Sequence, residues 1–353
     1  MGRVHLEAVR RLGDVEAIPV TSRDPDEVRK ALDDKSVTAV HICTPNATHS
    51  ALIKASLEAG KHVLCEKPLT TSTSDAAYLT DLARARRLRN CTCHNLRYYP
   101  MVQQMRRMRE AGDLGEIFIV QGTYSQDWLL YDTDWNWRID PEDAGPSRTL
   151  ADIGSHWTDM AEHITGSRIT QVCTDLQTYH KTRKRPKAQV ETFAGKTLAP
   201  EDYDAVGVNS EDFASVIFRM GSRIRGTFTA SQVSAGRKNG LRMEIYGSKS
   251  SVAWNQERPD ELWIGNRNTN NQVIIKDPAL LKEGARAYAD LPGGHSEGYD
   301  DTFKQVFRRF YHSIEDPRAA VEYPTFEDGV RQLKILDGEL ASHLRRAWVE
   351  IPA

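Results

Sequence analysis

Short apolar runs alternate with helical patterns through the first 115 residues, and this alternation constrains the fold more than any other feature of the sequence. Strands that alternate with helices of such length form a parallel sheet covered by its crossover helices. We predict helices over 4–12, 50–58 and 74–88, and strands over 15–20, 37–43, 61–65 and 91–95. Residues 1–115 are therefore predicted to form a doubly wound α/β domain.

The carboxyl ends of the predicted strands carry polar segments. These are TPNATH at 44–49, EKP at 66–68 and HNLRYYP at 94–100. Sheets of this kind bind ligands beyond the carboxyl ends of their strands. The three segments are therefore expected to line one edge of the sheet and to form part of a binding site.

After residue 115 the pattern changes to strands separated by glycines and polar turns, as in an antiparallel sheet. We predict a second, α+β domain over 116–353 with a large, mostly antiparallel open sheet, whose C-terminal helix packs back on the first domain. Its strands are expected over 116–124, 169–179, 212–219, 223–233, 241–246 and 251–254, and its helices over 153–164, 298–314 and 325–345.

The composition narrows the classes of function. The 353 residues are 39% hydrophobic and 27% charged, and the formal net charge of −2 offers no attraction for nucleic acid or an anionic membrane. The five cysteines have neither zinc spacing nor an even disulfide framework. No apolar segment approaches membrane-spanning length. We expect a cytoplasmic protein with reduced thiols and without a metal, nucleic-acid or membrane partner.

Lys67 follows a predicted buried strand and precedes Pro68, which puts its amine at the carboxyl end of that strand. One interpretation is a solvated pair of Glu66 and Lys67 that ends the strand. The other is a lysine desolvated beside Glu66, which donates a hydrogen bond or a proton to a substrate oxygen. The spacing alone leaves both open.

The segment LADIGSHWTDMAEHI, residues 150–164, places Asp152 and His156 four residues apart and therefore on one face of a helix. An aspartate so placed can orient the imidazole and suit it to take a proton from an alcohol. The alternative is an N-cap aspartate followed by a packed helix. Gly154 and Ser155 allow a ligand or another segment to approach closely, which favours a functional role.

The segment DWLLYDTDWNWRID, residues 127–140, combines three tryptophans and a tyrosine with acids and an arginine. Aromatic side chains of this size need burial. They form either a domain interface or stacking surfaces for a sugar ring or a nicotinamide, with Arg138 as a fixed fork of donors.

Taken together, TPN..H, EKP, the Asn-x-Arg strand, NWR and DIGSH occur in an order and spacing that resembles the Gfo/Idh/MocA oxidoreductases over residues 2–345. That family joins an N-terminal Rossmann domain to a C-terminal α+β domain, and it oxidises or reduces sugars and cyclitols with NAD(P). The resemblance implies a catalytic trio of Lys67, Asp152 and His156. In this trio His156 is the general base, Lys67 binds the reacting hydroxyl, and Asp152 orients the base or anchors the substrate.

The resemblance also implies the residues that surround the ligands. Cofactor contacts are expected at Gly2, Thr44, Pro45, Asn46, His49, Glu66, Lys67, Asn95, Trp137 and Arg138. Substrate contacts are expected at Lys67, Trp128, Tyr131, Trp135, Asp152, His156 and His295.

The pattern breaks at the start of the chain. A dinucleotide-binding domain begins with a strand and G-x-G-x-x-G, whereas only Gly2 matches here, as the last glycine. Only about fourteen residues separate Arg23 from the strand at Val37, roughly twenty fewer than usual. Either the sequence is incomplete, or the deletions are genuine and the protein binds without hydride transfer. A sheet without its central strand loses ladder hydrogen bonds, so we expect the first.

The predicted function is hydride transfer between NAD or NADP and a ring hydroxyl or ketone of a sugar, glycoside or cyclitol. Both cofactors are compatible, because Ser22 stands where an acid usually binds the NAD ribose and Arg23 beside it can accept a 2′-phosphate. Two alternatives stay open: a non-catalytic carbohydrate-binding or regulatory protein, and a glycoside-cleaving enzyme with a hidden redox cycle. An open sheet usually covers its exposed face, so a homodimer or homotetramer is expected.

Overall fold

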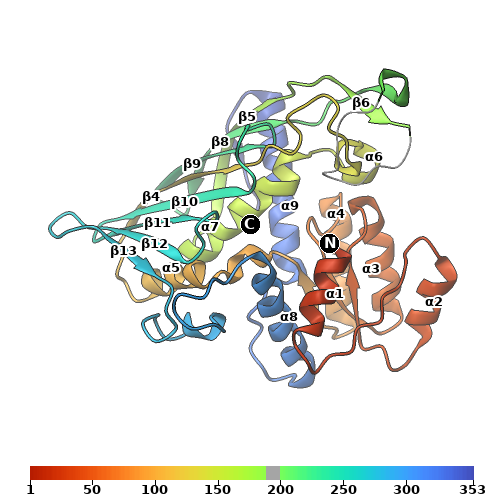
Figure 1. Cartoon of the computed structure of the whole chain (residues 1–353), viewed down its shortest axis with the longest axis horizontal. Helices are drawn as coiled ribbons and strands as arrows, with labels where there is room; N and C mark the ends of the chain where they lie inside the picture. Colours follow the sequence, from red (N-terminus) through yellow and green to blue (C-terminus); the bar gives the residue numbers. More distant parts are fainter. Residues whose placement is uncertain (188–198) are drawn as a thin grey trace.

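A computed structural model describes residues 1–187 and 199–353, in which a small and a large sheet lie on either side of helices α8 and α9 (Figure 1). The small sheet is parallel, in the order β1-β2-β3. Its strands are β1 (Ala39–Ile42), β2 (His62–Cys65) and β3 (Asn90–Thr92), and its crossover helices are α3 (His49–Glu58) and α4 (Thr73–Ala85). The predicted parallel α/β arrangement is therefore confirmed.

Helix α1 (Gly2–Arg10) confirms the predicted first helix, but the strand predicted over 15–20 is wrong. A strand needs a neighbour to complete its ladder, and β1 pairs only with β2 in the described parts of the chain. Ile18 and Val20 are accordingly exposed. Helix α2 (Pro25–Asp33) follows, where Asp24 accepts hydrogen bonds from the first-turn amides and Pro25 begins the helix.

The large sheet confirms the predicted α+β part. Its order is β13-β12-β11-β10-β4-β9-β8-β5-β14, and among these pairs only β4 and β9 run parallel. The strands are β4 (Ile117–Ser125), β5 (Ile169–Gln177), β8 (Phe213–Met220), β9 (Ile224–Ser231), β10 (Gly240–Gly247), β11 (Ser251–Asn255), β12 (Glu261–Gly265), β13 (Gln272–Ile275) and β14 (Val349–Glu350). The last three, and the hairpin of β6 (Thr182–Pro186) with β7 (Tyr203–Gly207), were not predicted.

Helices α5 (Pro100–Glu110), α7 (Ser155–Thr165) and α9 (Phe326–Arg345) pack on one face of the large sheet. Trp157 of α7 is fully buried there and stacks on Phe228 of β9 at 4.5 Å between ring centroids. Gly122 of β4 makes room for it, because a Cβ at this position would lie 2.9 Å from the indole nitrogen. The opposite face leaves large apolar side chains such as Ile119 and Ile217 exposed.

Helix α8 (Tyr299–Glu315) returns to the first part of the chain and packs on α1. Phe303, Phe307 and Phe310 form a core there with residues of α1, β2 and β3. Helix α9 also contacts α4 and β3. The boundary at residue 115 stays a prediction, because this core joins segments from both of its sides. Within the described residues, we find no helix with the length and apolar character that crossing a membrane requires.

Candidate active site

Lys67 lies directly after β2, and its ammonium group is held by Asp152. Its Nζ donates to the backbone oxygen of Asp152 at 2.5 Å and to the Oδ1 atom at 3.1 Å. The side chains of Lys67 and Asp152 are only 9% and 17% exposed. The interpretation of Glu66 and Lys67 as a solvated pair is therefore wrong, since both are withdrawn from water and bind different partners.

Asp152 is the centre of the cluster, because each of its carboxylate oxygens accepts a side-chain hydrogen bond. Besides Lys67, Oδ1 accepts one from Arg138 Nε at 3.2 Å, and Oδ2 accepts one from Gln232 Nε2 at 2.8 Å. Burial acts to raise the pKa of Asp152, but Lys67 and Arg138 together lower it to about 2. The carboxylate therefore stays ionised at neutral pH and fixes two cations beside it.

His156 lies in the first turn of α7, directly after the π-helical turn Leu150–Gly154 that carries Asp152. All hydrogen bonds of the Asp152 carboxylate go to Lys67, Arg138 and Gln232, so none in the described structure joins it to His156. The wider π turn changes the angular spacing on which the predicted contact depended. Burial and the nearby charge of Lys67 hold the pKa of His156 well below its usual range. Its imidazole is therefore neutral and able to accept a proton.

The segment after β1 contains Thr44, Pro45, Asn46 and His49. The amide of Asn46 donates to the backbone oxygen of Ala144 in α6 (Pro141–Ala144) at 2.9 Å. The buried ring of His49 lies 2.9 Å from the backbone oxygen of Pro68 and 3.0 Å from that of Thr44. His49 thus joins the segments after β1 and β2 and positions them, whereas its predicted cofactor contact stays a prediction.

Glu66 points away from Lys67, towards a partner that the sequence did not indicate. Its Oε1 lies 2.7 Å from His5 Nε2 of α1. Burial acts to raise the pKa of Glu66, but the bond from His5 and the charges of His5, Lys67 and the N-terminus together lower it. Ligand-type atoms of His5, Glu66 and Cys93 lie within 4.8 Å of one another. Burial and Glu66 raise the pKa of Cys93, which opposes the thiolate that a metal needs, so we assign no metal here.

Asn95 lies in the 3-10 turn η2 (Asn95–Tyr98) after β3. It is buried, and its amide nitrogen donates to Thr302 Oγ1 of α8 at 2.7 Å. The residue is therefore fixed at the predicted edge of the sheet, while its role near a cofactor stays a prediction.

A pocket of about 230 Å³ lies beside Lys67 and Asp152. Arg138 reaches it from the turn η3 (Trp137–Ile139), with its guanidinium 4.4 Å from the centre of the Trp137 ring. The pocket is lined by Asn46, Lys67, Pro68, Arg138, Ala144, Ser147, Arg148, Ala151 and Asp152. The structure thus brings together predicted residues of four segments of the sequence. Gln232, Ser147 and Arg148 were missed, because no local pattern marks them.

Apart from Arg138, the side chains of the tryptophan-rich segment are not part of the pocket lining. Trp128 and Trp135 cover a small core of Leu129, Ile139 and Val208, whereas Tyr131 is 59% exposed. Because all of these residues belong to the predicted second domain, the domain interface stays a prediction for Trp128 and Trp135. Their predicted contact with a sugar ring stays a prediction.

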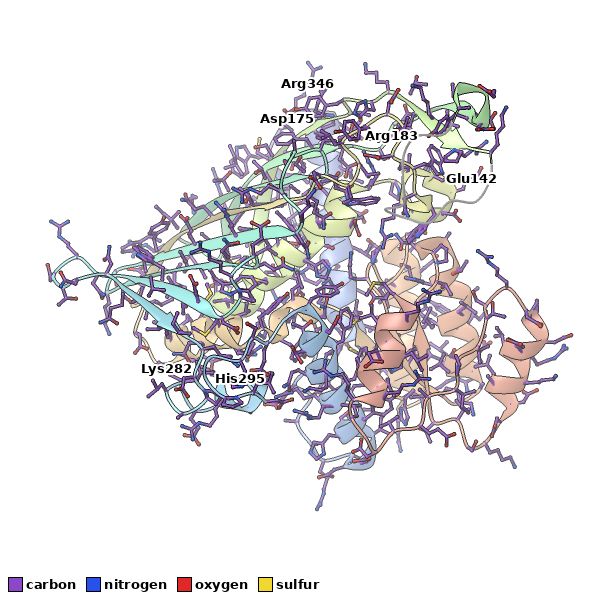
Figure 2. All side chains as sticks on the ribbon, viewed as in Figure 1. Glu142, Asp175, Arg183, Lys282, His295 and Arg346 are labelled. Atoms are coloured by element: carbon purple, nitrogen blue, oxygen red, sulfur yellow. The ribbon has the colours of Figure 1, made fainter. Side chains whose placement is uncertain are left out.

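Four other predicted residues lie apart from the pocket lining. Gly2 begins α1, and Ser22 and Arg23 lie in the exposed turn before α2. His295 is exposed on the segment after β13, where its backbone oxygen accepts a hydrogen bond from Lys276 at 2.7 Å. Figure 2 shows His295 near Lys282, across the molecule from Glu142 of α6. His295 is thus not part of the lining of the pocket beside Lys67 and Asp152, and its predicted contact with the substrate stays a prediction.

Comparisons with known proteins agree with the fold described above. Residues 4–94 match the oxidoreductase family with an NAD-binding Rossmann fold, and residues 102–253 match the GFO/IDH/MocA C-terminal domain. The chain is 28% identical to levoglucosan dehydrogenase of Pseudarthrobacter phenanthrenivorans, over 98% of this chain and 86% of the relative.

Two solved structures show the same fold over most of the chain. The oxidoreductase domain protein from Kribbella flavida is 30% identical, covers 92% of this chain, is itself covered to 83%, and has a TM-score of 0.81. A levoglucosan dehydrogenase in complex with NADH and levoglucosan is 26% identical, covers 100% of this chain, is covered to 89%, and has a TM-score of 0.82.

Proposed function

This chain belongs to the Gfo/Idh/MocA family of oxidoreductases, and from this premise we propose that it is a dehydrogenase that transfers hydride between a nicotinamide cofactor and a ring hydroxyl of a sugar. The observation that carries the proposal is the cluster of Lys67, Asp152 and Arg138 in the wall of a pocket, next to a neutral His156. An inert surface has no need of two cations and a proton acceptor at one pocket.

The residues of the pocket fit the nicotinamide end of the cofactor. Asn46 and Arg138 provide amide and guanidinium donors in its lining, and the flat Trp137–Arg138 pair offers a stacking surface beside it. At the pyrophosphate end, the exposed N-terminus of α1 at Gly2 supplies unpaired amides. We assign these residues to the cofactor, which when bound supplies the hydride acceptor.

The reaction asks three things of the protein. Lys67 uses a free ammonium hydrogen to bind the reacting hydroxyl oxygen and stabilises the negative charge that develops there. His156 takes the hydroxyl proton, for which its neutral state is required. Asp152 holds Lys67 and Arg138 in place, so in this proposal it acts as the anchor of the site rather than through a hydrogen bond to the base.

The substrate class is tested by incubating the protein with NAD or NADP and single sugars, beginning with levoglucosan and an inositol, and following nicotinamide absorbance. Cofactor binding is measured separately by fluorescence titration with NADH and NADPH. Binding without turnover would favour the carbohydrate-binding alternative. Cleaved glycoside products without accumulated NADH would identify the hidden redox cycle.

The role of Lys67 has its own test. Lys67→Ala should lower turnover by about 10²–10⁴-fold, the usual contribution of a positioned acid or base, and change cofactor affinity much less. Lys54→Ala is the matched control, because Lys54 is an exposed lysine on the neighbouring helix α3. Equal losses of turnover and cofactor affinity in Lys67→Ala would contradict the assigned role.

A further inference from the structure

His94 lies beside His156, yet the reaction described above makes no use of it. His94 directly follows β3 and is only 1% exposed. Its ring centroid lies 5.8 Å from that of His156, and the two planes are perpendicular, at 89°. The second imidazole is therefore in edge-to-face contact with the proposed base.

The polar atoms of His94 are unusual for so buried a side chain. Among the described residues, neither Nδ1 nor Nε2 of His94 has a hydrogen-bond partner, and the Nδ1 atom of His156 has none either. Buried polar atoms normally find partners, because leaving them unpaired destabilises the fold. A leucine or phenylalanine would fill this space without that cost. An imidazole at this position therefore indicates a role in the site.

The groups around His94 define which of its nitrogens carries hydrogen. The nearest carboxylate is that of Asp159 on α7, with Oδ1 4.0 Å from His94 Nδ1. Arg97 of η2 holds Asp159 through Nε at 2.7 Å and also pairs with Asp328 of α9 at 2.8 Å. The Asp159 carboxylate attracts an N–H, so His94 is assigned the tautomer with hydrogen on Nδ1.

We propose that His94 is a positioning residue for His156, whose imidazole it holds perpendicular to its own ring with Nδ1 turned inward and Nε2 left for the substrate. The inference rests on the proposed dehydrogenase function and assigns a further residue to the same site. The Nδ1 atom of His156 is buried without a partner and its Nε2 atom is not, in agreement with this orientation.

The charges around the pair add a second consequence. Burial lowers the pKa of both imidazoles, and Lys67 opposes protonation of both. Asp159 and Asp328 favour the protonated form of His94 alone, against the opposing charge of Arg97. His94 therefore takes up a proton before His156 as the pH falls, and the charge it then carries keeps His156 neutral.

The first test compares pH profiles of kcat/KM for sugar oxidation. His94→Phe keeps a ring but removes both nitrogens, so the acid limb should move to higher pH by about one unit, the effect of a lost neighbouring charge. His94→Asn removes the ring, so kcat should fall by about tenfold or more at every pH while KM changes little. His163→Phe is the control, because His163 lies on α7 with His156 but has a hydrogen-bond partner of its own, Gln103. A His94→Phe profile that coincides with the wild type overturns the proposal.

The second test does not depend on turnover. Nitrogen-15 spectra of histidine-labelled wild-type protein should show His94 protonated on Nδ1 and titrating at a higher pH than His156. The opposite order or tautomer overturns the proposal even in an active enzyme. If the protein oxidises no sugar but the spectra show this order, the proposed function fails and the arrangement of the two imidazoles stands.

Discussion

Two clusters of this protein have the same composition, a carboxylate between two cations, but they differ in their access to water. In the pocket, Asp152 binds Lys67 and Arg138, whose side chains are 9% and 26% exposed. About 60 residues further along, Asp212 binds Arg148 and Arg183, and all three side chains are fully buried, although Arg148 also borders the pocket. Composition alone therefore does not separate a reactive cluster from a structural one.

The difference lies in what the remaining donors and acceptors do. The second oxygen of Asp212 accepts hydrogen bonds from the backbone amides of Tyr179 and His180, at 2.7 and 3.1 Å. Arg183 also donates to backbone oxygens of the tryptophan-rich segment, including those of Leu129 and Tyr131. This cluster fastens the β6–β7 hairpin to the body of the protein. The pocket cluster instead keeps ammonium and guanidinium hydrogens for a ligand.

The strongest test of the comparison removes the charge of the pocket carboxylate. Asp152→Asn should lower kcat by about 10²–10⁴-fold, because Lys67 and Arg138 lose the anchor that positions them. The free energy of unfolding at pH 7 should fall by about 2 kcal/mol, because the lowered pKa of Asp152 is itself a contribution to stability. The pKa of about 2 means that Asp152 contributes stability above its unfolded pKa and loses it only as the pH falls through about 2. A much larger loss of stability at pH 7 would make this cluster structural too.

The matching change in the closed cluster should have the opposite profile. Asp212→Asn leaves two buried arginines without their carboxylate, so the free energy of unfolding should fall by about 3–5 kcal/mol. The kcat of the folded fraction should fall much less than in Asp152→Asn, because only Arg148 of this cluster borders the pocket. Urea unfolding measures the first quantity, and turnover at low temperature measures the second. A fall in kcat as large as that of Asp152→Asn would contradict the assignment of a structural role to the Asp212 cluster.

A smaller effect is expected when Arg183 of the closed cluster is replaced. Arg183→Met keeps the apolar stem but removes the bonds to Asp212 and to the tryptophan-rich segment, and should cost about 2 kcal/mol. Amide hydrogen exchange over residues 127–137 should become faster than in the wild type. Lys181→Met, at an exposed lysine just before the same strand, is the control and should leave exchange unchanged. Unchanged exchange in Arg183→Met would show that the hairpin does not hold this segment.

The smallest effect concerns a third carboxylate next to the closed cluster. Burial and the charge of Glu211 raise the pKa of Glu339 on α9 to about 8. The folded state thus binds a proton that the unfolded state has released, so stability falls as the pH rises from about 4.3 towards 8. Glu339→Gln should equal the wild type at pH 5 and exceed it at pH 9 by on the order of 1–2 kcal/mol in urea unfolding. Glu327→Gln, exposed on the same helix, should show no such dependence on pH.

The sequence predicted the pocket better than the contacts within it. Parallel strands end at one edge, so Asn46 and Lys67 were expected together, and the order of the motifs added Arg138 and Asp152. Gln232 reaches Asp152 from the end of β9, 80 residues away, and no local pattern announces such a contact. The predicted link from Asp152 to His156 assumed an α-helical turn, and the π turn at 150–154 removed it.

Strand prediction failed where a strand depends on its neighbour. The apolar run 15–20 has a suitable composition, but periodicity describes one segment and a ladder needs two. The short strands β12 to β14 show the opposite case, because they are present in the structure but were not predicted. They are too brief to show a pattern, and pairing with β11 and β5 holds them in place.

The return of α8 to the first part of the chain has a consequence for biosynthesis. The core that α1, β2 and β3 share contains Phe303, Phe307 and Phe310, which are made roughly 200 residues after β3. At about 5–20 residues per second, the ribosome delivers them some 10–40 s later. Until then α8 does not cover the nascent parallel sheet, and Leu64 and its neighbours are exposed to chaperones and proteases. The core of the N-terminal part of this protein is therefore completed only after α8 has been synthesised.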